Sequence, residues 1–600
     1  MARALPARLL GTLLLLAPLL PVPSGAAGAG ERPPAAAVAT AHPLATEAAL
    51  EVLRAGGNAF DAAVAAAAAL AVVEPYGSGL GGGGFFLLHR AADGRELMLD
   101  ARERAPLAAR RDLYLDADGR VIPKASVDGP LAAAVPGLPA ALTHLAGRYG
   151  RLPLARSLAP AIALAREGFP VDARYRALAR FRLEALRASP EAARIFLADG
   201  EVPPEGWRLR QPELAAVLEA LARRGREGFY AGPVAEALVE GVRAAGGIWT
   251  REDLAAYRVV EREPVRGTYR GIRVTSASLP SSGGIVLLEM LHVLEGYPLE
   301  RLAPATRVHL LVEAMRRAYR DRAVHLGDPD LVAVPVERLL SRDYAAGLRA
   351  GIRLDRATPS ALLPGAAGEA AGDHTTHFSI LDAEGNRVAA TLSINFPFGS
   401  GFVPPGTGVL LNDEMDDFAA KPGVPNLYGL VGGEANAIAP GKRPLSSMSP
   451  TFLDDGRRLA ILGTPGGSRI ITMVLLATLD FAAGRGPRSW VGLGRFHHQF
   501  LPDEVQAEPG ALGAELIRAL EAMGHRVRVP GRRWGNMQAV LWDRERGAVE
   551  AASDPRGGGL ARVVPAAGLA RARPAGLVSA GRMEHPPAGL APEGGGKAGN

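Results

Sequence analysis

Alternation of polar and apolar side chains is clearest between residues 375 and 395. Two apolar and β-branched runs flank a turn at Gly385 and Asn386, which predicts a β-hairpin. With an odd-numbered loop, the alternation separates one apolar face from one polar face. The apolar face holds Phe378, Ile380, Ala390, Leu392 and Ile394. The polar face holds Thr375, His377, Ser379, Thr391, Ser393 and Asn395. Half-polar strands are common, so the hairpin alone indicates no chemistry.

Apolar residues recur at helical spacing elsewhere in the chain. The pattern predicts helices at 46–54, 59–73, 142–149, 154–166, 175–186, 211–223, 285–294 and 307–319, and strands at 85–88 and 96–99. Between helix 59–73 and strand 85–88, Gly77, Gly79 and Gly82 have the spacing of a dinucleotide-binding fingerprint. That fingerprint requires a strand before the glycines and a helix after them, and here the order is reversed. Nucleotide binding is therefore not expected.

The two ends of the chain differ from the rest in composition. Residues 1–29 combine Arg3 and Arg8, a short apolar run and small residues, which is typical of a secretory signal peptide. The apolar run is shorter than the ~20 residues of a membrane span. We therefore expect an exported protein, periplasmic or secreted, with no stable membrane anchor. Residues 566–600 are rich in alanine, proline and glycine, which predicts a disordered tail.

Composition excludes several classes of protein. A hydrophobic content of 48% supports a large core. The absence of cysteine excludes disulfides, thiolate metal sites and a cysteine nucleophile. The net charge of +6 is spread thinly, with no basic stripe, so a nucleic-acid partner is not expected. His497 and His498 lack a third ligand at metal spacing, so we predict no metal and no cofactor, and buried or surface histidines instead.

Five segments, in order, carry a resemblance to a known family. Asp373-His374-Thr375-Thr376-His377-Phe378-Ser379 resembles the processing site of γ-glutamyltranspeptidases (glutathione hydrolase proenzymes), which are N-terminal nucleophile hydrolases. Segments 100–106, 408–418, 442–451 and 463–469 are similar to the same family. The resemblance runs from about residue 37 to about residue 562. It implies an α+β fold, the four-layer αββα sandwich of N-terminal nucleophile hydrolases, formed jointly by a large and a small subunit.

The resemblance also implies that the chain cleaves itself between His374 and Thr375. Removal of a signal peptide, residues 1–29, would leave a large subunit of residues 30–374 and a small subunit of residues 375–600. Thr375 would be the nucleophile, and its own α-amine, with an ordinary pKa of about 8, would be the base. Ser393 stands where the family usually has a second threonine that supports the nucleophile; the hydroxyl is retained and a methyl is lost.

The remaining site residues are assigned by resemblance to a γ-glutamyl substrate. Arg102, Ser446 and Ser447 would bind its α-carboxylate. Asn395, Glu414 and Asp417 would bind its α-ammonium. Gly466 and Gly467 would supply the backbone N–H donors of an oxyanion hole. Tyr428, in a loop punctuated by glycine and proline, would belong to a lid over the pocket.

The implied activity is that of a γ-glutamyltransferase and glutathione hydrolase. The γ-glutamyl group of glutathione or a related amide would form an ester with Thr375 and then pass to water, an amino acid or a peptide. Two alternatives stay open. One is a β-lactam side-chain (cephalosporin-type) acylase of the same superfamily, which should lack the full set of clamp and lid residues. The other is an uncleaved, inactive homologue that acts as a binding protein.

Overall fold

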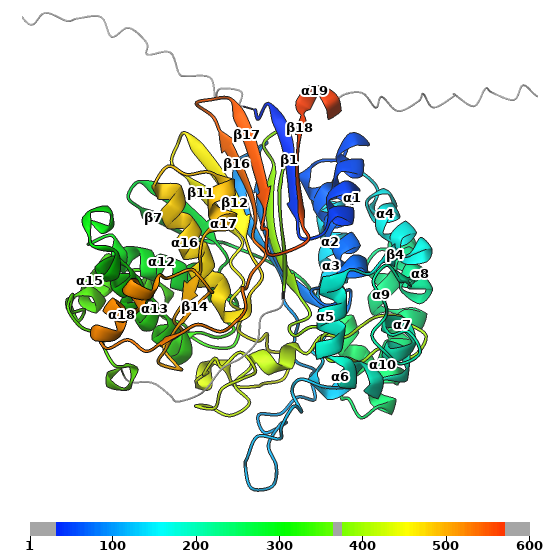
Figure 1. The fold of residues 1–600 in the computed structure, drawn as a ribbon. Coiled ribbons are helices and arrows are strands. Elements are labelled where there is room, and N and C mark those ends of the chain that lie inside the picture. Colours follow the sequence, from blue (N-terminus) through cyan, green and yellow to red (C-terminus); the bar gives the residue numbers. More distant parts are fainter. Residues whose placement is uncertain (1–31, 364–374, 570–600) are drawn as a thin grey trace, which may run out of the picture.

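Two β-sheets lie face to face between two layers of helices (Figure 1). The computed structural model describes residues 32–363 and 375–569. The seven-stranded sheet has the order β18 (Leu560–Pro565), β1 (Ala35–Thr40), β9 (Thr376–Leu381), β10 (Arg387–Ser393), β2 (Gly83–Arg90), β3 (Arg95–Ala101) and β6 (Val260–Arg262). The six-stranded sheet has the order β17 (Ala548–Ser553), β16 (Gln538–Asp543), β12 (Arg458–Gly463), β11 (Thr451–Asp454), β8 (Ile272–Ser276) and β7 (Val265–Tyr269). The predicted α+β, four-layer αββα fold is confirmed.

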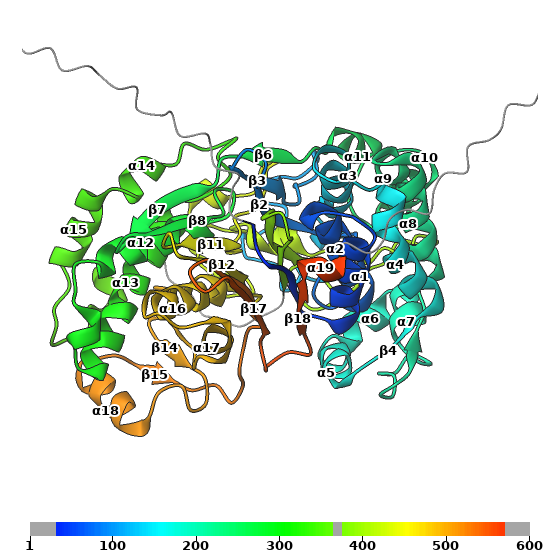
Figure 2. The same cartoon turned by 90° about the horizontal axis from the view of Figure 1, so that it is seen from above.

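One helical layer covers the seven-stranded sheet and the other covers the six-stranded sheet (Figures 1 and 2). The first layer contains α1 (Pro43–Arg54), α2 (Ala59–Val73), α3 (Leu138–Arg148), α4 (Leu154–Glu167), α5 (Ala173–Phe181), α6 (Leu183–Ala188), α7 (Pro190–Phe196), α8 (Pro212–Arg224), α9 (Glu227–Tyr230), α10 (Gly232–Ala244) and α11 (Arg251–Ala256). The second contains α12 (Gly283–Leu294), α13 (Pro304–His325), α14 (Val336–Leu339), α15 (Arg342–Ala350), α16 (Ile470–Ala482), α17 (Pro487–Gly492) and α18 (Ala514–Ala522). Small sheets pair β4 (Phe169–Pro170) with β5 (Arg208–Leu209), and β13 (Phe496–His497) with β14 (Val505–Ala507) and β15 (Val527–Arg528).

The predicted hairpin is β9 and β10, and its register agrees with the alternation. Phe378 pairs with Ala390 and His377 pairs with Thr391. The apolar face packs into the same buried cluster as α2. The polar face is also buried, because it lies against the second sheet: Ser379 donates to the carbonyl oxygen of Gln538 on β16, at 3.1 Å. At Ser379 the polar face is therefore part of the interface between the sheets.

One predicted helix is wrong. The range 175–186 forms two helices, α5 and α6, because the backbone leaves helical geometry at Arg182, where ψ is 14°. The Arg182 guanidinium is held elsewhere: it donates to the carbonyl oxygens of Pro397 (3.0 Å) and Gly399 (2.8 Å). It also forms an ion pair of 2.8 Å with Asp128. Tertiary bonds of one buried side chain thus turn the chain inside a stretch with continuous helical periodicity.

The ends of the chain are only partly described. The predicted signal peptide lies outside the described residues. We expected a disordered tail over residues 566–600. Its first four residues form the short helix α19 (Ala566–Leu569), and residues 570–600 lie outside the described residues. Within residues 32–363 and 375–569, no helix has the length and hydropathy needed to cross a membrane.

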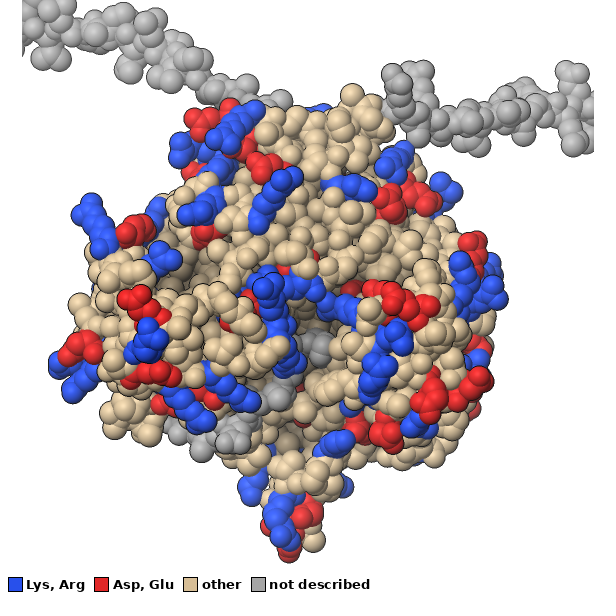
Figure 3. All heavy atoms as spheres, in the orientation of Figure 1, with Lys and Arg blue, Asp and Glu red and all other residues tan. Residues whose placement is uncertain are grey.

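Basic and acidic side chains are interspersed over most of the face drawn in Figure 3.

Candidate active site

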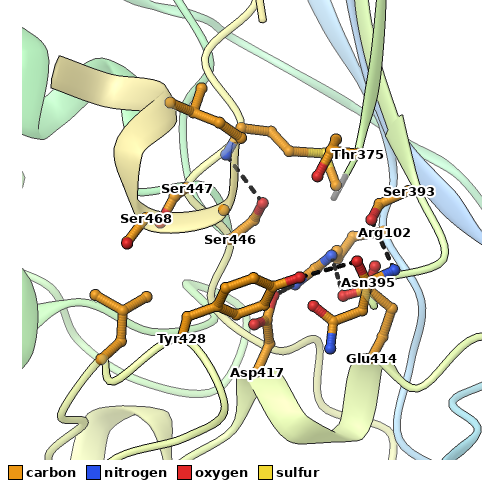
Figure 4. A pocket seen from close by; sticks show the side chains of 14 residues that line it. Arg102, Thr375, Ser393, Asn395, Glu414, Asp417, Tyr428, Ser446, Ser447 and Ser468 are labelled. Atoms are coloured by element: carbon orange, nitrogen blue, oxygen red, sulfur yellow. Dashed lines mark hydrogen bonds and ion pairs between the residues drawn. The ribbon is translucent and has the colours of Figure 1, made fainter. Parts of the chain in front are cut away.

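A pocket lies where β9 begins and β10 ends, and most of the predicted site residues line it (Figure 4). The predicted residues in its wall are Arg102, Thr375, Ser393, Asn395, Glu414, Asp417, Tyr428, Ser446, Ser447 and Gly467. Leu430, Met448, Ser468 and Ile470 complete the wall. Gly466 precedes the wall residue Gly467 without lining the pocket itself, and His374 lies outside the described residues. Segments more than 300 residues apart in the sequence thus converge at one place.

Thr375 and Ser393 face each other across the end of the hairpin. Thr376 pairs with Leu392, so the same antiparallel register places Thr375 opposite Ser393. Thr375 is 7% exposed, and its side chain points into the pocket beside Ser393 (Figure 4). The Ser393 hydroxyl oxygen accepts a hydrogen bond of 2.7 Å from the backbone N–H of Asn395. The strand pairing itself therefore brings the two hydroxyls together.

Arg102 follows the last residue of β3 and is fully buried. Its Nη1 lies 2.6 Å from Oε2 of Glu414, and its Nη2 donates to Asp417. Its Nε donates to the carbonyl oxygen of Pro444, at 3.1 Å. Burial disfavours the guanidinium charge, but the carboxylates around it outweigh that cost and raise its pKa. Arg102 is consequently a fixed cation in the wall of the pocket.

Arg102 comes close to Ser393 because the strand between them carries a glycine. Gly83 on β2 pairs with Ser393 on β10, and the next residue, Gly84, pairs with Ala101 at the end of β3. A Cβ atom at Gly83 would lie 2.2 Å from the carbonyl oxygen of Ala101 and 2.9 Å from Cδ of Glu103. Real Cβ atoms do not approach other atoms so closely, so a larger residue would push β3 and Arg102 away from the hairpin.

The two acidic residues belong to a short 3₁₀ turn, Glu414–Asp417. Asn412 holds the start of this turn: its Oδ1 accepts from the N–H of Glu414 (2.9 Å), and its Nδ2 donates to the carbonyl oxygen of Gly81 (2.6 Å). No hydrogen bond of good geometry reaches either carboxylate oxygen of Glu414. Burial raises the pKa of Glu414 well above its usual value, although Arg102 opposes this. A cationic group in the pocket would therefore find a carboxylate with unused acceptor capacity.

Gly466 and Gly467 form the turn that leads into α16. Their φ angles are +145° and +54°, a region that side chains with a Cβ atom rarely adopt. Gly467 is also the first residue of a 3₁₀ turn, Gly467–Arg469, which lies directly before α16. The first N–H groups of a helix lack partners within the helix, so this wall of the pocket is suited to a negative charge.

Tyr428 lines the pocket and belongs to the loop 421–433, which we call the lid loop after its predicted role. Its hydroxyl donates to the carbonyl oxygen of Asn395, at 2.8 Å, and the residue is 5% exposed. The loop is tied to the acidic turn as well, because the N–H of Leu427 donates to Oδ2 of Asp416 (3.0 Å). Asn395 has a φ of +71°, which is strained for a residue other than glycine and typical of functional sites.

A sequence model of the family described as Gamma-glutamyltranspeptidase matches residues 45–564, most of the chain. The chain belongs to the γ-glutamyltranspeptidase family. A glutathione hydrolase proenzyme of Pseudomonas sp. (strain A14) is 46% identical over 502 residues, which are 82% of this chain and 86% of the relative. One of Escherichia coli (strain K12) is 42% identical over 527 residues, 86% of this chain and 90% of the relative. The resemblance inferred from five motifs is thereby confirmed.

Among solved structures, a cephalosporin acylase from Bacillus halodurans is similar to this chain, with a TM-score of 0.77. The identity is 29%, and the match covers 92% of this chain and 99% of that chain. The likeness supports the predicted sandwich.

The sequence did not predict one arginine that lies next to the pocket. Arg322 is buried on α13, and its Nη2 donates to the hydroxyl oxygen of Ser447, at 3.1 Å. Its Nε donates to the hydroxyl oxygen of Ser282 (2.9 Å), and Ser282 in turn donates to the carbonyl oxygen of Ser446 (2.7 Å). The predicted helix stopped at Tyr319, six residues before α13 ends at His325. Continuing the helical spacing to residue 322 would have placed the arginine on the face of Tyr319.

One cluster of the described residues has the composition of a metal site, and its surroundings do not suit a cation. Ligand atoms of His309, Glu313 and His525 lie within 4.8 Å of one another. Glu313 is already paired with Arg317, whose Nη1 lies 2.5 Å away, and with Arg316 at 3.3 Å. His309 uses both ring nitrogens, one towards His525 and one towards a backbone carbonyl oxygen. A divalent ion would have to displace these bonds beside two guanidinium groups.

Proposed function

We propose that the chain is a self-cleaving γ-glutamyltransferase and hydrolase that acts on glutathione and related γ-glutamyl amides. One observation carries this proposal: Thr375 lines the same small pocket as one buried arginine and two acidic residues. An amino acid's α-carbon presents a carboxylate and an ammonium group side by side. Arg102 and Glu414, whose charged atoms lie 2.6 Å apart, present the complementary pair.

The first reaction is cleavage of the bond between His374 and Thr375. Oγ of Thr375 attacks the carbonyl carbon of His374, the C–N bond breaks, and an ester replaces the amide while the nitrogen takes up a proton. Water then hydrolyses the ester, which leaves a carboxylate on His374 and a free hydroxyl and α-amine on Thr375. Each sheet contains strands from both sides of residue 375, so residues 30–374 and 375–600 would stay together as large and small subunits.

The bound substrate would be oriented by the charged groups. Arg102, Ser446 and Ser447 would hold its α-carboxylate, with Arg322 fixing the hydroxyl of Ser447. Asn395, Glu414 and Asp417 would hold its α-ammonium. Such a pair of opposite half-sites fixes both ends of an amino acid, so the γ-carbonyl is the group left to reach Thr375.

In the transfer reaction the α-amine of Thr375 takes the proton from Oγ, which attacks the γ-carbonyl carbon. Ser393 would hold the nucleophile in place. Backbone N–H groups at Gly466 and Gly467 would stabilise the oxyanion, each such donor being worth roughly 3 kcal/mol. The leaving amine takes the proton, and the γ-glutamyl ester then passes to water, an amino acid or a peptide. Tyr428 would exclude bulk water during these steps.

A β-lactam side-chain acylase is the second candidate, favoured by the likeness to the cephalosporin acylase structure. Glu414 and Asp417 favour a γ-glutamyl group over an acyl group without an α-ammonium, because both acidic side chains line the pocket. We also propose that the protein is exported, to the periplasm or beyond, as expected from residues 1–29.

The decisive experiment combines N-terminal sequencing with an assay on a γ-glutamyl anilide. We expect two chains, the smaller one starting at Thr375, and release of the aniline. Thr375→Ala should stay a single chain without activity. A stable, uncut wild-type chain would refute the enzyme and leave a binding protein. A cut chain that hydrolyses a glutaryl anilide faster than the γ-glutamyl anilide would favour the acylase.

A further inference from the structure

The buried triplet His497, His498 and Gln499 lies behind the pocket, and no role described above uses it. The three residues are 1%, 0% and 5% exposed, respectively. His497 is the last residue of β13, and His498 and Gln499 follow it directly. Polar side chains that are buried so completely need defined partners, and the partners of Gln499 connect it to the pocket.

Gln499 makes three side-chain hydrogen bonds. Its Oε1 accepts from Oγ of Ser468 (2.7 Å) and faces Nε2 of His497 (2.9 Å). Its Nε2 donates to the backbone carbonyl oxygen of Tyr428, at 3.2 Å. A carbonyl oxygen can only accept, so the amide nitrogen must face Tyr428, and the orientation of the amide is fixed by chemistry.

His497 fixes the same orientation from the other side. Burial lowers its pKa well below the usual value, and nearby Arg469 adds to this effect, so the ring is neutral. A neutral ring has one proton, which must lie on Nε2 because that nitrogen faces an acceptor, Oε1 of Gln499. The other nitrogen, Nδ1, lies 3.0 Å from Oγ1 of Thr472.

Tyr428 is therefore fastened at two points on opposite walls of the pocket. Its hydroxyl reaches the carbonyl oxygen of Asn395 on the hairpin side, and its own carbonyl oxygen accepts from Gln499 on the side of Ser468. Asn395, Tyr428 and Ser468 all line the pocket (Figure 4). Only the first of the two tethers depends on the tyrosine side chain.

We propose that Gln499 is a positioning residue that determines specificity: it fastens the lid loop to the pocket wall at Ser468 and so excludes acyl groups larger than γ-glutamyl. His497 orients the amide for this task. The substrate part of the inference rests on the proposed function. The fastening of the lid loop does not, and it can be measured without any substrate.

The test uses two variants and a matched control. Gln499→Met keeps the length of the side chain and removes its donor and acceptors. Gln499→Glu keeps an acceptor for Ser468 and His497 and places an oxygen against the Tyr428 carbonyl. The control is Gln211→Met: Gln211 is also buried, and its Nε2 donates to the carbonyl oxygen of Val72 (2.9 Å) in the first helical layer. Thermal unfolding of all three variants checks that they are folded.

The first readout is the rate of chymotrypsin cleavage after Tyr428 in the purified protein, followed by mass spectrometry. Loss of one hydrogen bond shifts such an opening equilibrium by about 2- to 12-fold, so we expect roughly fivefold faster cleavage in both Gln499 variants and no change in Gln211→Met. Cleavage of both Gln499 variants at the wild-type rate would overturn the proposal.

The second readout is the split between KM and kcat. We expect KM for a γ-glutamyl anilide to rise about fivefold in both Gln499 variants, with kcat within about twofold, because the nucleophile does not move. Hydrolysis of an anilide with a longer acyl chain should rise relative to wild type. A fall in kcat at unchanged KM would contradict the assigned role. If the wild type lacks γ-glutamyl activity, the proposed function fails, while the cleavage rates still decide whether Gln499 fastens the lid loop.

Discussion

Arg102 and Glu414 meet in a buried ion pair, with Nη1 of the arginine 2.6 Å from Oε2 of the glutamate. The groups that we assign to the substrate's carboxylate and ammonium are therefore in direct contact before any substrate arrives. A zwitterionic amino acid can insert between them and exchange this internal pair for two external ones. Because the charges stay balanced, the exchange avoids leaving an isolated buried charge.

Replacement of Arg102 by lysine should weaken substrate binding. Lysine keeps the charge, but it cannot reach Glu414, Asp417 and the carbonyl oxygen of Pro444 at once with a planar fork. We expect KM for a γ-glutamyl anilide to rise roughly 100-fold, with a smaller change in kcat. A matched control is Arg495→Lys, since Arg495 is equally buried, pairs with Asp554 and does not line the pocket. An equal rise in KM for the control would show a general loss of structure instead.

The pH dependence of KM should depend on Glu414. Its pKa is raised by burial, so the carboxylate is increasingly neutral as the pH falls and then binds an ammonium less strongly. We expect KM of the wild type to fall as the pH rises, until the substrate's own amine loses its proton. Glu414→Gln should raise KM most at high pH, have less effect as the pH falls, and so flatten this dependence. Steady-state kinetics across the pH range would check it, and an unchanged slope in the variant would assign the titration to another group.

Arg322 and Ser447 should act as one unit. The arginine donates to the Ser447 hydroxyl, at 3.1 Å, and lies outside the pocket wall itself. We expect Arg322→Lys and Ser447→Ala each to raise KM several-fold, and the double variant to be little worse than either. A double-mutant cycle measures the coupling, for which about 1 kcal/mol is expected. Additive effects would mean that Arg322 does not act through Ser447.

Asp416 should make stability depend on pH. It ties the acidic turn to the lid loop, and burial raises its pKa to about 7. The folded state then holds a proton that the unfolded chain releases near pH 4. The associated stability is present below about pH 4 and is lost as the pH rises towards 7, a change of at most about 4 kcal/mol. Asp416→Asn should lack this loss, so the wild type should become less stable relative to the variant as the pH rises.

Denaturant unfolding of the wild type and of Asp416→Asn at several pH values measures this difference in stability. Asp455 provides a control for which the stability should change with pH in the opposite direction. Burial opposes ionisation of Asp455, but hydrogen bonds from Arg458 outweigh it and lower its pKa. The wild type should therefore gain stability relative to Asp455→Asn as the pH rises through the acidic range. The same trend for both variants would contradict the assignment to Asp416.

Local periodicity predicted helices and strands correctly where the local sequence alone determines them. Helix 59–73 agrees residue for residue with α2, whose side chains are buried all round, and the hairpin register follows from alternation. The break at Arg182 could not be read in the same way, because bonds to Pro397 and Gly399 cause it. Those partners are more than 200 residues away in the sequence.

By itself, the sequence determined the family, the face on which Thr375 and Ser393 lie, and the residue types of the pocket. Only the tertiary structure decided what covers that face. Ser379 turned out to serve the contact between the sheets, whereas Thr375 at the end of the same face reaches the pocket. The contacts of Arg322 and Gln499 with the pocket could not be predicted from the sequence for the same reason. Periodicity reports which side chains share one side of one element, while contacts between distant elements depend on how whole sheets and helices pack.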